Sequence, residues 1–322
     1  MTTWTKRALL APALAAMLAV SGAGLAAEKG KDAAKAAAKP AAEQSMKKAE
    51  AAKAAQGRKT ADVKARKSGA EKANAERGKI YAEAVIALRE TQNAIKALDK
   101  KDKKAAMAAL ERAVGKLEIL LARAPDLALA PVDVQTQTLD IYADVKSVKK
   151  AVKDSIALLK KGRVQDARAL VSGLASEIVI EVVNVPLATY PDAIKAVAPL
   201  IEKGKFKEAK AGLIAALNTL VITRHILPLP ILRTEQMLKR AEVLAEKAKR
   251  SKDEEKELAD ILKAARAELQ FAEALGYGKE GDFKPFYEQL DLIAEKTRGG
   301  KHGKGFFDKL KKALSDFRAK LF

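Results

Sequence analysis

Cysteine is absent from this chain of 322 residues, and histidine occurs only twice, as His225 and His302. Without cysteine there is no disulfide, no thiol catalysis and no cysteine-ligated metal. A metal site built from several imidazoles is disfavoured because the chain holds too few. Aromatic residues make up only 4% of the chain, so a core of this size must be mainly aliphatic. We therefore expect a fold stabilised by aliphatic packing, with neither a metal nor a cofactor.

Signatures of catalysis are missing as well. The chain has no glycine-rich phosphate loop after a strand, no GxSxG turn and no HExxH helix. Carboxylates one helical turn apart do occur, as in Asp140 with Asp144 and Glu177 with Glu181. They leave an acid/base or metal pair open, but this spacing also arises freely in charged helices. We expect no enzyme activity.

The first 26 residues have the three regions of a secretory signal peptide. Lys6 and Arg7 precede an uncharged Ala/Leu run over residues 8–25, and small residues occupy positions 24, 26 and 27 at its end. Cleavage after Ala26 places small residues at both recognition positions. No later apolar run approaches the roughly 20 residues of a membrane span. We expect export and a periplasmic location, and a mature chain that begins near residue 27.

Positive charge is concentrated at the two flanks of the mature chain. The net charge is +20, and residues 27–79 hold 15 bases against 7 acids while residues 296–322 hold 9 against 2. The Ala/Lys-rich segment 27–79 has almost no large apolar side chain, which predicts a solvated low-complexity tail. Any binding of polyanions is therefore expected at the flanks. Nucleic acid is not an expected partner, since this tail lacks aromatics for base stacking.

A folded domain is predicted over residues 80–296, where apolar residues recur at steps of three and four. Within it the chain repeats itself at an offset of 42 residues, which aligns Gly162 with Gly204 and Pro186 with Pro228. An offset of 61 extends the match to an earlier helix and pairs Pro125 with Pro186. A fixed period of this length indicates a repeated helical hairpin. The prediction is an all-α fold, an antiparallel helical bundle built on that hairpin with a low-complexity N-terminal tail.

Two segments of the repeat are ambiguous between helix and strand. Residues 164–183 are rich in β-branched side chains towards their end, but comparison with the partner segment at 220–224 favours helix for both. A further helix is expected over 206–226. Residues 125–138, with two prolines and alternating valines, predict an extended connection.

Three stretches of this region carry a family resemblance: PVDV at 131–134, VPLATYPDAIK at 185–195 and GKFKEAKAGL at 204–213. With them the chain resembles the YfdX family over residues 80–250. The resemblance implies an exported, all-helical envelope protein of bacteria that is linked to stress responses and self-associates as a homo-oligomer. It implies no catalytic residues, and it implies nothing about the two basic flanks.

The C-terminus predicts a cationic amphipathic helix over residues 306–322, preceded by a Gly-rich linker at 297–305. Two interpretations stay open. The linker would let the helix lie on an anionic membrane or envelope polymer, or the helix could dock on the body as a last core helix. The residues expected to contact a membrane are Phe306, Phe307, Leu310, Lys311, Lys312, Leu314, Phe317, Arg318 and Leu321.

His225 is placed by the pattern near the end of a repeat helix. A histidine there can cap the helix, or it can act as a pH-sensitive group. The leading hypothesis is a non-catalytic, stress-protective binding protein that self-associates and engages a client or small ligand. The alternative is a membrane-surface protein that acts through its C-terminal helix.

Overall fold

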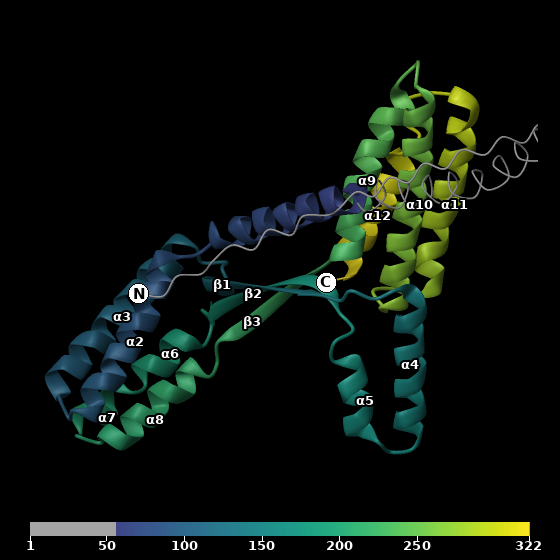
Figure 1. Cartoon of the computed structure of the whole chain (residues 1–322). Helices are drawn as coiled ribbons and strands as arrows, with labels where there is room; N and C mark the ends of the chain where they lie inside the picture. Colours follow the sequence, from purple (N-terminus) through teal and green to yellow (C-terminus); the bar gives the residue numbers. More distant parts are fainter. Residues whose placement is uncertain (1–55, 322) are drawn as a thin grey trace, which may run out of the picture. The chain divides into compact units, whose positions relative to one another are not determined.

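The computed structural model describes residues 56–321, so the predicted signal peptide at 1–26 and the tail segment 27–55 lie outside the described residues. The described part is mostly helical with one small sheet (Figure 1), which confirms the predicted fold class. A first helix occupies residues 56–77. The other elements are α2 (Ala82–Asp99), α3 (Lys103–Arg123), β1 (Leu129–Asp140), α4 (Val145–Lys160), α5 (Val164–Val171), β2 (Ser176–Pro186), α6 (Tyr190–Lys195), α7 (Ala198–Glu202), α8 (Phe206–Leu217), β3 (Val221–Pro228), α9 (Leu229–Glu246), α10 (Lys252–Ala274), α11 (Glu280–Thr297), the 3₁₀ turn η1 (Arg298–Gly300) and α12 (Asp308–Leu321).

The middle of the chain consists of three related units, each a helical hairpin followed by a strand. They are α2–α3–β1, α4–α5–β2 and α6–α7–α8–β3. Each hairpin turn holds one residue with positive φ, namely Lys101 (57°), Gly162 (72°) and Gly204 (71°). The next residue donates its backbone N–H to the carbonyl five positions earlier, at 2.9–3.0 Å, as in a Schellman turn. These turns confirm the predicted repeat at both offsets.

Each unit ends in a strand. Helix was predicted for residues 178–183 and 220–224, which fall in β2 and at the start of β3, so that prediction was wrong. β2 lies between β1 and β3 in an antiparallel sheet. Along β2 the side chains of Ile178, Ile180 and Val182 are buried and those between them half-buried. Neighbouring strands supply the hydrogen bonds that let a β-branched run take this period of two. The offset of 42 therefore pairs strand with strand, and the predicted helix over 206–226 ends at Leu217.

The first unit departs from the alignment beyond its turn. α3 continues to Arg123, so Ile119 lies exposed on a helix although the offset of 61 aligned it with Ile180 of β2. The match between Pro125 and Pro186 is also wrong, because Pro125 precedes β1 and Pro186 ends β2. The expected extended segment at 125–138 contributes most of β1.

Buried side chains form three clusters, which are mainly aliphatic. The first joins the hairpins of the outer two units and includes Leu117 and Leu213. The second joins Ala61 of the first helix to α9–α12, where three phenylalanines pack edge to face. The third lies between the helix at 56–77, the sheet and the start of α9. Within residues 56–321, none of these clusters includes a residue of α4 or α5.

The helix at 56–77 packs on the body, although the sequence predicted a solvated tail for this segment. Its small side chains Ala61, Ala65 and Ala73 are buried. A Cβ on Gly69 would collide with Ile178 of β2, so the helix backbone approaches the sheet closely. Small residues supply little apolar area but allow this close contact, which composition alone does not reveal.

The C-terminal segment is also held to the body. The guanidinium of Arg250 donates to the carbonyls of Thr297 at 3.0 Å and Lys301 at 2.7 Å, which ties down the linker predicted as a flexible tether. α12 buries its apolar stripe in the second cluster, so of the two interpretations the docked one is observed. No helix between residues 56 and 321 carries an apolar stretch that would cross a bilayer.

Candidate functional site

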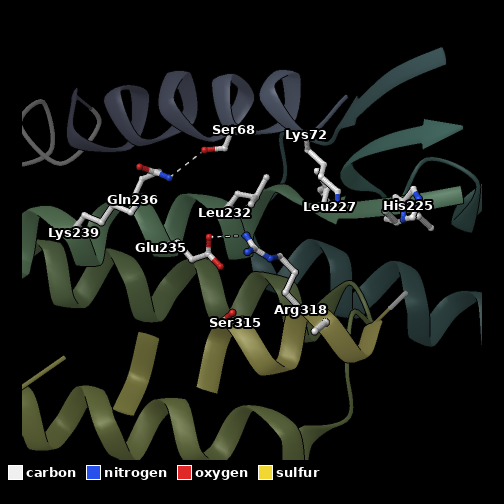
Figure 2. Close-up of a pocket in the computed structure, with 12 residues that line it drawn as sticks. Ser68, Lys72, His225, Leu227, Leu232, Glu235, Gln236, Lys239, Ser315 and Arg318 are labelled. Carbon is white, nitrogen blue, oxygen red and sulfur yellow. Dashed lines mark hydrogen bonds and ion pairs between the residues drawn. The ribbon is translucent and has the colours of Figure 1, made fainter. Parts of the chain in front are cut away.

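A hollow of about 510 Å³ opens where four elements meet: the helix at 56–77, β3, α9 and α12 (Figure 2). We call it the β3–α12 pocket. Its volume lies within the usual range for small-molecule sites. The lining residues are Ser68, Lys72, His225, Ile226, Leu227, Leu232, Glu235, Gln236, Lys239, Ser315, Arg318 and Ala319.

One carboxylate and several cationic groups face this pocket. Glu235 and Arg318 point towards each other in Figure 2, with 2.9 Å between Oε2 and Nη1. Burial raises the pKa of Glu235, and the charges of Arg318 and Lys239 oppose that rise. Lys72 forms an ion pair with Glu76, with 3.3 Å between Nζ and Oε1. Within residues 56–321, Lys239 has no ion-pair partner within 4.0 Å, so the pocket carries a positive excess.

The remaining lining combines neutral polar groups with an apolar wall. The amide of Gln236 donates to the hydroxyl of Ser68 at 3.5 Å, and Leu227 and Leu232 supply aliphatic surface. This arrangement suits an anion with an apolar body, because charge attracts one end and the wall desolvates the other. No His, Cys, Asp or Glu side chains within residues 56–321 gather in threes as metal ligands would.

His225, predicted at a helix end, lies instead on β3 opposite Ile180 of β2. The helix prediction was wrong here because β3 takes the place of the last helical turns. The ring is half-buried, lines the pocket, and makes no hydrogen bond to another described residue. Its role as a pH-sensitive group stays a prediction.

The residues predicted to contact a membrane differ in their surroundings. Phe307, Leu310, Leu314 and Phe317 are buried against the body, so they are not available to a bilayer while α12 is docked. Among the polar residues, Arg318 lines the pocket, Lys311 pairs with Glu242 at 2.7 Å, and Lys312 is exposed. Phe306 is half-buried under the ammonium of Lys296, 5.3 Å from the ring centre. The side chain of Leu321 lies outside the described part.

A separate cluster of charges lies beside the sheet, with the buried Arg233 of α9 as its central group. Its Nη2 lies 2.6 Å from both Asp140 at the end of β1 and Asp62 of the first helix. Arg66 also donates to Asp140 at 2.6 Å, and Arg58 reaches the buried Glu268 of α10 at 2.6 Å. Three cations thus meet three carboxylates, and the balanced cluster joins four elements.

The two carboxylate pairs considered from the sequence do not form shared sites. Asp140 belongs to the Arg233 cluster, whereas Asp144 accepts from the backbone of Ser147 at 2.7 Å and caps α4. Glu177 accepts from the hydroxyl of Tyr277 at 2.8 Å. Glu181 lies on the same strand and pairs with Arg224 at 2.6 Å. Each carboxylate therefore has its own structural partner.

Comparison with known protein families places a match on the three units of the middle region. The family model described as "YfdX protein" matches residues 87–226, from within α2 to β3. A solved structure of YfdX from Salmonella Typhi is 14% identical with a TM-score of 0.33, and the match covers 47% of this chain and 93% of that one. No match is found among curated proteins. The β3–α12 pocket lies mostly beyond the matched segment.

Proposed function

Residues 87–226 of this chain belong to the YfdX family, and from this premise we propose that the protein is an exported, non-catalytic binding protein with a ligand site in the β3–α12 pocket. The YfdX family is not known as an enzyme family, which supports binding rather than catalysis. The observation that carries the proposal is the positive excess of the pocket. Arg318, Lys239 and Lys72 line it against the single carboxylate of Glu235, beside an aliphatic wall.

The ligand class follows from these two features. A small organic anion would place its negative end near Lys239 and Arg318 and its apolar body along Leu227 and Leu232. Arg318 keeps one nitrogen on Glu235, and its other N–H groups remain for a carboxylate. An amphipathic carboxylate of about eight carbons is a suitable probe, because it fits the volume typical of such pockets.

Calorimetric titration of residues 27–322 with octanoate, octanol and octylammonium tests this proposal. Octanoate should bind more tightly than the neutral and cationic probes of the same length. Changing Lys239→Glu should weaken octanoate binding by about tenfold, because it removes one partly exposed attraction and adds a repulsion. Lys263→Glu, an exposed lysine of α10 away from the pocket, is the matched control and should change nothing.

Equal binding of octanoate and octanol would contradict the charge argument. An unchanged affinity in Lys239→Glu would remove the pocket as the site. Melting temperatures of both variants show whether the fold is intact.

Export to the periplasm, stress protection and self-association stay predictions. The family membership supports them, and the apolar side chains exposed on the body are compatible with contacts between copies. Light scattering of residues 27–322 over a range of concentrations checks the homo-oligomer. A constant monomer mass would exclude it.

A further inference from the structure

The α4–α5 hairpin exposes an apolar surface that the other hairpins bury. Among the described residues, six of the thirteen exposed large apolar side chains fall between residues 142 and 171. They are Tyr142, Ile156, Leu159, Val164, Leu170 and Val171. The outer units share one core with each other, so the middle hairpin has no matching hairpin among the described residues.

The same hairpin is strongly basic. Residues 145–171 contain eight lysines and arginines but only two acids, for a net charge of +6. On α4, Lys153 and Lys160 lie three and four positions from Ile156, so they border its exposed apolar stripe. Both acids are already paired, Asp154 with Lys150 at 2.6 Å and Asp166 with Arg163 at 2.7 Å.

Charge decides which partner fits this surface. A second copy of the hairpin would bring another net charge of +6 against the first, and like charges oppose that contact. An anionic lipid surface supplies both requirements, since headgroups attract the lysines and the acyl boundary receives the apolar stripe. α4 is about 24 Å long at 1.5 Å per residue, which suits a helix that lies in the interface.

We infer that the α4–α5 hairpin docks on an anionic lipid surface through the apolar stripe of Ile156 and Leu159 and the lysines beside it. This site differs from α12, whose apolar side chains are buried in the body. It is also independent of the β3–α12 pocket, which no residue of the hairpin lines.

Co-sedimentation of residues 27–322 with vesicles tests the inference. Vesicles that contain phosphatidylglycerol should bind the protein and pure phosphatidylcholine vesicles should not, and added salt should weaken binding. Lys149→Glu with Lys153→Glu should weaken binding at least about 25-fold, because each basic residue near an anionic surface contributes about fivefold. Ile156→Ser with Leu159→Ser should weaken binding at all salt concentrations.

The matched control is Lys309→Glu with Lys312→Glu, which changes the same charge on exposed positions of α12. It should weaken binding far less than the hairpin variant. A larger loss in the α12 variant than in the hairpin variant would overturn the inference, as would absence of wild-type binding to anionic vesicles. A fall in solution mass for the Ile156 and Leu159 variant, without vesicle binding by the wild type, would assign the surface to a second copy instead.

Discussion

Replacing Arg233 by methionine tests whether charge balance holds the first helix, the sheet and α9–α10 together. The side chain of Arg233 is only 5% exposed, and its partners Asp140 and Glu268 are 9% and 4% exposed. Methionine keeps helix propensity and much of the volume. The substitution leaves the three carboxylates of the cluster with only two cations, Arg58 and Arg66.

The expected loss in free energy of unfolding is about 3–5 kcal/mol, the usual result of leaving one partner of a buried ion pair unpaired. Glu268 should be the group most affected, because its Oε2 has no hydrogen bond and burial already raises its pKa. Adding Glu268→Gln to Arg233→Met restores the balance with two cations and two carboxylates. The double variant should recover at least about 1 kcal/mol relative to the single one.

Urea unfolding followed by far-ultraviolet circular dichroism measures these differences, since the one tryptophan, Trp4, lies in the predicted signal peptide. The dependence of the free energy on urea should stay the same in all variants. A double variant as unstable as the sum of the two single changes would refute the charge-balance argument. It would show that Arg233 stabilises the fold through packing alone.

Three further predictions concern other elements. Lys101→Gly should stabilise the protein by about 0.5–1 kcal/mol, because glycine adopts positive φ without the strain of a side chain. Gly162→Ala should destabilise it for the same reason. Urea unfolding measures both changes, and a change of the same sign and size in the two variants would contradict this. The hydrogen bond from Arg112 lowers the pKa of Glu90, so the stability this carboxylate contributes is present above its ordinary pKa and lost as the pH falls through the lowered value. Glu90→Gln should therefore cost about 1 kcal/mol at neutral pH and little in acid, whereas a cost independent of pH would argue against the ion pair. Arg250→Ala should speed amide hydrogen exchange in the linker at 297–305, and unchanged protection would mean that its bonds to the linker do not hold that segment.

Local signals in the sequence predicted much of the fold. The apolar periodicity predicted a helical domain from residue 80 onwards, and the paired glycines at 162 and 204 placed two of the hairpin turns. These features depend on contacts between residues a few positions apart. β2 and β3 were missed because the hydrogen bonds of the sheet join segments about 45 residues apart, and the repeat was taken as evidence for helix in both copies.

The candidate pocket was predictable only in fragments. His225 and Arg318 were singled out from the sequence, but for a helix end and a membrane contact. Their neighbours Lys72, Glu235 and Lys239 carry no local signal, since each is an ordinary charged position on a helix. Four elements far apart in the chain form the pocket, and only their packing brings these charges together.

Composition and periodicity by themselves determined that this protein is mostly helical, aliphatic in its core, repetitive in its middle and basic at its flanks. Those properties follow from the composition, from the spacing of apolar residues along a helix, or from comparison of the sequence with itself. The tertiary structure decided which amphipathic faces are covered. It buried the stripe of α12 and left that of the α4–α5 hairpin exposed, although both read alike in sequence, because coverage depends on whether another element lies opposite.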